Sequence, residues 1–198
     1  IKPEYEYNND LVRFFLDDNG YKIRNGASPY INLRANSNKS NTKKIVYIHP
    51  FTGGSSKTLS VSDFINLCYE LNKFCKLKFV LHCDHDDYEK CKIIENKMCN
   101  LLDVETINPT DNLKEMFINI SKCDVFISGS TGPLHVAGAL NIKTVGFYPA
   151  KKSSTSLRWD TINNQNNKLF FEDTDIFSQD IQVDIQSVAA EIFDKLLK

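Results

Sequence analysis

Short apolar segments of strand length alternate with segments of helical periodicity along most of this chain. The expected strands are residues 44–48, 77–81, 104–107, 124–128, 144–147 and 168–171. The expected helices are residues 60–75, 85–98, 112–122, 133–140 and 184–197. Strands that alternate with helices pair in parallel, and strands that are apolar on both faces must be covered on both sides. The pattern therefore predicts an α/β fold with a doubly wound, Rossmann-like parallel sheet.

The first 43 residues are expected to form an appendage to this sheet. Residues 9–20 begin with cap-forming asparagines, place Leu11, Phe14 and Phe15 on one helical face, and end in Gly20. Residues 36–42 are polar without an apolar period, which is typical of a linker. We therefore expect a connector helix and linker over residues 1–43 and a nucleotide-binding domain over residues 44–198, in a chain of 198 residues.

Composition excludes several classes of protein. The 24 Lys and Arg residues balance 25 Asp and Glu residues, which argues against binding nucleic acid through bulk positive charge. The apolar runs are far shorter than the ~20 residues of a membrane span. Six cysteines without a C-x-x-C pair favour reduced thiols over a disulfide framework or a zinc site. The start of the chain lacks both Met and the features of a signal peptide, so we expect a fragment of a longer protein.

The loop after residue 48 reads HPFTGGSSK, at the strand end where doubly wound sheets bind ligands. Its adjacent glycines let backbone N–H groups approach an anion, Thr52 offers a hydroxyl, and Lys57 offers a charge suited to phosphate. The loop is not a Walker A motif, because no Gly-Lys-Ser/Thr closes it. A solvated Gly/Ser loop with an incidental lysine would explain the same residues.

The loop after residue 128 reads SGSTGPLH. A proline at position 133 suits a first helical turn, so Ser130, Thr131 and Gly132 are expected at a helix N-terminus. Free amides and the positive end of the helix dipole make such a terminus an anion site, and His135 can donate a hydrogen bond to a phosphate oxygen. The alternative is structural, with a hydroxyl as N-cap and a partly buried histidine.

Two further loops hold weaker candidates. The loop after residue 81, HCDHDD, contains metal-ligand types but no second cluster at metal spacing, so no metal site is predicted. Glu89 follows it and is a candidate for contact with a nucleotide ribose. The loop after residue 147 is basic and includes Arg158, which suits a phosphate or a sugar acid. A solvated basic loop anchored by Trp159 is the alternative.

The order and spacing of these segments resemble glycosyltransferase family 9, the heptosyltransferases of lipopolysaccharide core assembly. The resemblance lies in KIVYIHPFTGGSSKTLSVSDFINLCYEL, in TDNLKEMF and above all in CDVFISGSTGPLHVAGALNIKTVGFYP, and it spans about residues 44–160. The segment KKSSTSLRW is similar to a Ser-Pro-x-Arg-Trp ending of some members. The leading helix resembles the connector between the family's two halves.

The resemblance implies a GT-B glycosyltransferase, of which this chain is the C-terminal, donor-binding half. Thr52 and Lys57 would hold the donor's phosphates, and a second group would bind the pyrophosphate of an ADP-activated heptose: Ser130, Thr131, Gly132 and His135. Many members have Asp at the position of Ser130. The general base lies in the family's N-terminal domain, so no catalytic residue is expected in this chain, which should bind without catalysing.

The implied reaction transfers a heptose or related sugar from an ADP-activated donor to a lipopolysaccharide or lipooligosaccharide core acceptor. It needs no cofactor and no metal, since the ADP-sugar is a substrate. The implied location is cytoplasmic, at the inner face of the bacterial inner membrane, with peripheral membrane contact through the missing domain and no nucleic-acid partner. Two alternatives stay open: another GT-B nucleotide-sugar enzyme, such as an epimerase or hydrolase that prefers uridine nucleotides, and a noncatalytic α/β domain.

Overall fold

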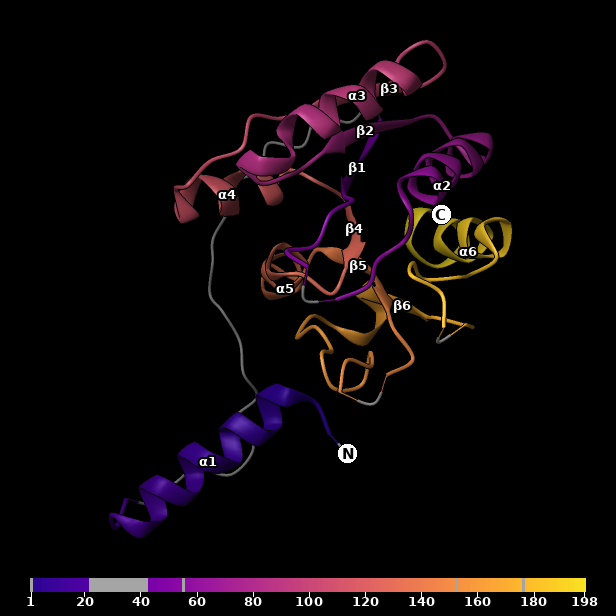
Figure 1. Cartoon of the computed structure of the whole chain (residues 1–198). Coiled ribbons are helices and arrows are strands. Elements are labelled where there is room, and N and C mark those ends of the chain that lie inside the picture. The colour runs from indigo at the N-terminus through magenta and orange to yellow at the C-terminus, as the bar shows by residue number, and fades with distance from the viewer. Residues whose placement is uncertain (1, 22–42, 55, 152, 176) are drawn as a thin grey trace.

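A six-stranded parallel sheet forms the centre of the computed structural model, which describes residues 2–21, 43–54, 56–151, 153–175 and 177–198 (Figure 1). The strands lie in the order β3-β2-β1-β4-β5-β6, and every neighbouring pair is parallel. Their bounds are β1 Lys44–His49, β2 Leu77–Leu81, β3 Asp103–Thr106, β4 Val125–Gly129, β5 Lys143–Tyr148 and β6 Lys168–Glu172. This is the strand order of a Rossmann-type sheet, so the predicted fold class is confirmed.

Helices cover both faces of the sheet. The helices that follow the strands are α2 Val61–Phe74, α3 Tyr88–Met98, α4 Leu113–Ile120, α5 Gly132–Ala139 and α6 Ile185–Ile192. A 3-10 turn, His85–Asp87, precedes α3, and another, Gln165–Asn167, precedes β6. A π-helical turn, Phe193–Leu197, extends α6. Side chains of α2, α3 and α6 pack in one core cluster, and those of α4 and α5 pack in the other.

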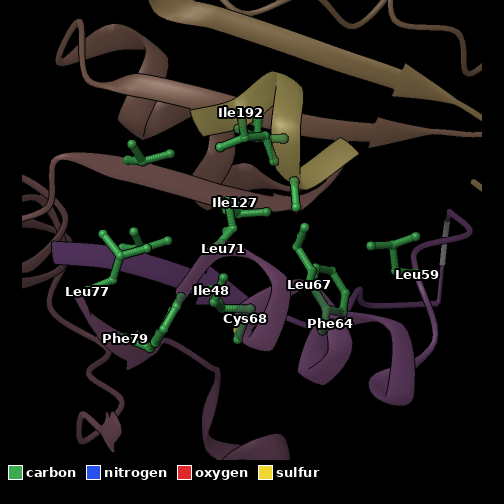
Figure 2. Close-up of a cluster of buried hydrophobic side chains, with 14 of the residues drawn as sticks. Ile48, Leu59, Phe64, Leu67, Cys68, Leu71, Leu77, Phe79, Ile127 and Ile192 are labelled. Atoms are coloured by element: carbon green, nitrogen blue, oxygen red, sulfur yellow. The ribbon is translucent and has the colours of Figure 1, made fainter. Parts of the chain in front are cut away.

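Alternation along the strands divides the core into these two clusters. Ile48, Phe79 and Ile127 point to the face that α2 and α6 cover, as Figure 2 shows, whereas Tyr47 and Phe126 point to the opposite face. Successive residues of a strand face opposite sides, so each central strand needs apolar residues on both faces. The edge strands differ: β3 alternates between exposed and half-buried residues, so the expectation of two apolar faces holds for the interior strands only.

The N-terminal helix, α1, spans Glu4–Asp18, so the predicted start at residue 9 with asparagine caps is wrong. Pro3 occupies the N-cap position, and Glu4 and Glu6 lie in the first turn, where acidic groups complement the helix dipole. The predicted end is correct, since Gly20 follows with φ +75°. No residue of α1 is buried, and the predicted linker at residues 36–42 lies outside the described residues.

The six cysteines are all free thiols, as the sequence predicted. Within the described ranges, no helix is long and apolar enough to cross a membrane.

A substitution at Leu71 tests the packing of the larger core cluster, because this side chain is fully buried between α2 and the sheet. We expect Leu71→Ala to lower the free energy of unfolding by about 2–5 kcal/mol, through lost burial and the cavity that remains. Urea denaturation measures this change. Leu101→Ala removes the same atoms from a side chain that is 73% exposed, and it should change stability by less than about 0.5 kcal/mol. Equal effects of the two substitutions would contradict this packing.

Candidate functional site

The loops after β1 and β4 meet at the point where the strand order reverses, the usual place for a ligand in such a sheet. Gly129, the last residue of β4, makes this contact possible. A Cβ atom at Gly129 would lie 2.8 Å from Thr58 Oγ1 and 3.3 Å from Thr52 Cγ2, both in the loop after β1. Only glycine lets the two loops approach this closely.

Helix α5 starts directly beyond Gly129 and directs its N-terminus into this region. Thr131 is its N-cap: the Thr131 hydroxyl accepts a hydrogen bond from the Leu134 N–H at 3.4 Å and lies 3.0 Å from Ser128 Oγ. The Thr131 hydroxyl is therefore the N-cap that the structural interpretation expected. Pro133 has no N–H and the Leu134 N–H donates to Thr131, so the Gly132 amide is the N–H of the first three helical residues that an anion can bind.

A hollow of about 310 Å³ opens at the N-terminus of α5. Its walls come from the loops after β1, β4 and β5 and consist of Ser56, Ser130, Thr131, Gly132, His135, Ser153, Ser154 and Trp159. Four residues that the sequence singled out therefore share one hollow, rich in hydroxyls and next to a helix dipole.

His135 lies in this hollow against Trp159, with ring centroids 6.4 Å apart in an edge-on arrangement. Burial lowers the pKa of His135 below its ordinary value, and the nearby Asp160 carboxylate partly opposes that effect. The neutral imidazole is therefore favoured, and it has one N–H to donate.

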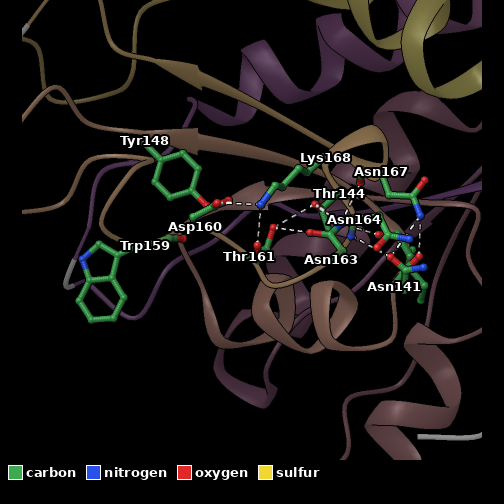
Figure 3. A network of polar contacts seen from close by, with 11 residues as sticks. Asn141, Thr144, Tyr148, Trp159, Asp160, Thr161, Asn163, Asn164, Asn167 and Lys168 are labelled. Carbon is green, nitrogen blue, oxygen red and sulfur yellow. Dashed lines mark hydrogen bonds and ion pairs between the residues drawn. The ribbon is translucent and has the colours of Figure 1, made fainter. Parts of the chain in front are cut away.

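A polar network behind α5 holds Trp159 in place (Figure 3). Lys168 Nζ lies 2.7 Å from Asp160 Oδ2 and donates to the Thr161 carbonyl at 2.9 Å. The Tyr148 hydroxyl donates to the Trp159 carbonyl at 3.0 Å. Because Lys168 and Tyr148 belong to β6 and β5, the sheet itself fixes the position of the wall that faces His135.

A second hollow, of about 670 Å³, adjoins the first, since Ser56 and Ser154 line both. Its other walls are Gly54, Lys57, Pro149, Ala150, Lys151, Asp173 and Gln179. The Lys57 ammonium borders this hollow, 3.5 Å from the Oδ2 atom of Asp173, whose side chain is fully buried.

Three predicted site residues line neither hollow. Thr52 Oγ1 donates to the Ser56 carbonyl at 2.8 Å and so braces its own loop. Glu89 is exposed on α3. Arg158 Nε donates to Glu4 Oε2 at 2.9 Å, and its carbonyl accepts from the Glu4 N–H at 2.7 Å, so it ties α1 to the sheet domain.

Sequence reasoning missed Asp173 and Gln179 as wall residues. One signal for Asp173 was available: two acidic residues, Glu172 and Asp173, follow the last predicted strand, at the same edge of the sheet as the other candidate loops. Nothing local marks Gln179.

Two buried histidines lie beside the site, at the ends of β1 and β2. His49 Nδ1 is 2.8 Å from the His82 carbonyl and 3.1 Å from His82 Nδ1. A carbonyl only accepts, so His49 carries its proton on Nδ1, and His82 Nδ1 is the unprotonated nitrogen. Burial, with His49 adding to it, lowers the pKa of His82 to about 3. Over the described part of the chain, no three His, Cys, Asp or Glu side chains group as metal ligands would.

Comparisons with known proteins agree with the resemblance. The family model of glycosyltransferase family 9 (heptosyltransferase) matches residues 16–179. A "Putative glycosyltransferase" of Haemophilus influenzae is 33% identical over an alignment of 182 residues that covers 86% of this chain and 52% of that protein. Lipooligosaccharide heptosyltransferase 2 of Campylobacter jejuni is 30% identical over 136 residues, covering 65% of this chain and 40% of that protein. The chain spans about half the length of the curated relatives it matches.

Solved structures share the fold. The E. coli ADP-heptose LPS heptosyltransferase II has a TM-score of 0.63 at 18% identity, over 80% of this chain and 48% of that one. The E. coli heptosyltransferase WaaC with ADP has a TM-score of 0.66 at 14% identity, over 92% of this chain and 54% of that one.

Gly129→Ala tests the contact between the two loops. The added methyl would overlap Thr58, so we expect a loss of about 1–3 kcal/mol in the free energy of unfolding. Thermal or urea denaturation measures it. Gly53→Ala is the control, because a Cβ there meets nothing within 4 Å. Adding Thr58→Ala to Gly129→Ala should recover part of the stability, since it removes Thr58 Oγ1, the atom closest to the added methyl, and leaves Thr58 Cβ at 3.0 Å. Among the described residues the buried Thr58 hydroxyl has no hydrogen-bond partner to lose, so no recovery at all would contradict the proposed overlap.

Because folded His82 stays neutral, we expect the free energy of unfolding to decrease in mild acid. The histidine of the unfolded chain takes up a proton near pH 6.5, whereas folded His82 stays neutral down to about pH 3. Its contribution is complete above pH 6.5 and is lost as the pH falls, by about 1.4 kcal/mol between pH 7.5 and 5.5. Urea denaturation at both pH values measures this loss. His82→Gln should reduce the pH dependence by about that amount, and an unchanged dependence would contradict the assignment.

Proposed function

The chain belongs to glycosyltransferase family 9, and from this premise we propose that it binds the nucleotide-sugar donor of a heptosyltransferase. The proposed donor is an ADP-activated heptose or a related sugar, and the proposed acceptor is a lipopolysaccharide or lipooligosaccharide core. The names of the relatives support this choice, since one is a lipooligosaccharide heptosyltransferase and one solved neighbour holds ADP. The proposed place of action is the cytoplasm, at the inner face of the inner membrane.

The N-terminus of α5, opening into the 310 Å³ hollow, is the observation that carries the proposal. A diphosphate there accepts hydrogen bonds from the backbone amides of residues 130–132 and from the Ser130 hydroxyl. The helix dipole favours its negative charge. His135 lines the same wall and supplies one further donor from its neutral imidazole.

The same groups suit the chemistry of sugar transfer. When the bond between the sugar and the diphosphate breaks, negative charge grows on the leaving diphosphate. Preorganised amides and the Lys57 ammonium stabilise that charge without a metal. We propose that the general base and the acceptor site belong to the part of the longer protein that lies beyond this chain.

The two hollows together suit a nucleotide sugar better than either does alone. Pockets for small molecules measure roughly 300–1,000 Å³, and the smaller hollow is at the lower end of that range. We propose that the diphosphate occupies the smaller hollow and that part of the donor extends into the larger one. Glu89 stays our candidate for the ribose, on the β2 side of the site. For Thr52 and Arg158 we propose supporting roles, in the loop after β1 and in the connection to α1.

Titration calorimetry of this chain with ADP, UDP and ADP-heptose tests the proposal. We expect saturable binding of the adenine ligands in preference to UDP. Lys57→Ala should weaken ADP binding about tenfold or more, and His135→Ala about three- to tenfold, since each removes a donor to the diphosphate. Lys76→Ala is the control. It removes an exposed lysine that precedes β2, at the amino ends of the strands and so opposite the site, and it should change the affinity less than twofold.

Two results would redirect the assignment. A preference for UDP would favour another GT-B nucleotide-sugar enzyme. Absence of binding by the folded chain would contradict donor binding by this half alone and would favour a noncatalytic domain.

A further inference from the structure

The Asp173 side chain is buried next to the proposed donor site and is only partly engaged. Asp173 is 7% exposed as a residue. Its Oδ1 atom accepts hydrogen bonds from the N–H groups of Asp175 and Gln182, each at 2.9 Å. Its Oδ2 atom is buried and, among the described residues, accepts no hydrogen bond. The two hydrogen bonds to Oδ1 thus fix the carboxylate, and the Oδ2 atom remains for a different interaction.

The Oδ2 atom faces the ammonium of Lys57. The distance from Lys57 Nζ to Asp173 Oδ2 is 3.5 Å, and both residues line the larger hollow. A buried carboxylate is costly without a countercharge, and Lys57 supplies one. The lysine, by contrast, keeps 28% of its side chain exposed, so it can meet a ligand on its other side.

The backbone also fixes Asp173 relative to the sheet. Its N–H donates to the Tyr148 carbonyl at 2.9 Å, which continues the pairing of β6 with β5. A flexible lysine on a glycine-rich loop is therefore held by a carboxylate that the sheet holds rigidly.

We propose that Asp173 is a positioning residue for the donor: it holds the Lys57 ammonium in the wall of the larger hollow, next to Ser56, which lines both hollows, so that the ammonium reaches the diphosphate. This inference rests on the proposed function. Asp173 acts through Lys57, because its Oδ2 atom is buried and lies 3.5 Å from the lysine ammonium, which is itself partly exposed. The direction of the effect on ADP affinity depends on Lys57. With the lysine in place, the Asp173 carboxylate positions a cation for the diphosphate, whereas without it the carboxylate would repel the diphosphate.

A double-mutant cycle with ADP as the ligand tests the role. Asp173→Asn keeps the Oδ1 acceptor and removes the charge. In the unaltered chain we expect it to weaken ADP binding about five- to tenfold, because the ammonium loses its fixed position. In a Lys57→Ala chain we expect the same substitution to leave ADP binding unchanged or stronger, because only the repulsion remains to be removed. Titration calorimetry of the four chains gives the coupling.

A merely structural role predicts a different result. If Asp173 only supported the loop at residues 173–182, Asp173→Asn would weaken ADP binding equally with and without Lys57, and that outcome would overturn the inference. Asp180→Asn, the same change at an exposed position of that loop, should alter the affinity less than twofold in both backgrounds. If Asp173→Asn does not fold, Asp173→Ser, whose hydroxyl can accept from the neighbouring amides, replaces it in the cycle.

The test separates this inference from the proposed function. If the unaltered folded chain binds no ADP, the proposed function and the inference both fail. If ADP binds and Lys57→Ala weakens the binding, the proposed function stands, and the coupling alone decides the role of Asp173.

Discussion

The contact between the end of β4 and the loop after β1 determines the geometry of the whole site. Gly129 lies against Thr58 and Thr52, without room for a side chain between them. Helix α5 starts three residues later, so its N-terminus has little freedom once β4 is placed in the sheet. The loop after β1 receives its position from the same contact. The anion site is therefore a consequence of how the two central strands end, and the surrounding loops adapt to it.

Buried polar groups orient the walls around this centre. Lys168 and Asp160 form an ion pair whose side chains are 6% and 19% exposed, and the segment that it anchors carries Trp159 to His135. Asp173 stands in a similar relation to Lys57. Buried ion pairs add little net stability, because desolvation offsets most of the attraction. Their value here is directional, since each fixes a group that would otherwise move with a loop.

The sequence allowed prediction wherever the signal was local. Central strands are continuous apolar runs, and Ser60 and Asn112 were recognisable at the starts of α2 and α4, where both now act as N-caps. Ser130 and His135 lie within two turns of chain, so their proximity followed from one helix start. The start of α1 was mispredicted because two asparagines suggested a cap while Pro3 and the acidic first turn determined the outcome.

Contacts between distant segments were beyond such reasoning. The pairing of Arg158 with Glu4, a residue 154 positions away, was not predicted. Asp173 and Gln179 reach the site only because β6 pairs beside β5 and directs the next loop to the same edge. Periodicity shows that a strand exists but not which neighbour it takes, so no local pattern identifies such residues.

The charge of the chain shows how such a site must work. With a formal charge of −1, the chain gains little from its net charge in attracting an anion. Positive potential at the site comes from the N-terminus of α5 and from Lys57 and Lys151, and Asp173 already offsets part of the charge of Lys57. A lysine with a fixed counter-carboxylate contributes little attraction at long range, but it presents a donor in a constant direction at short range. Such a site selects a diphosphate by the arrangement of its hydrogen-bond donors more than by the net charge of the protein. That arrangement depends on the rigid ends of the strands.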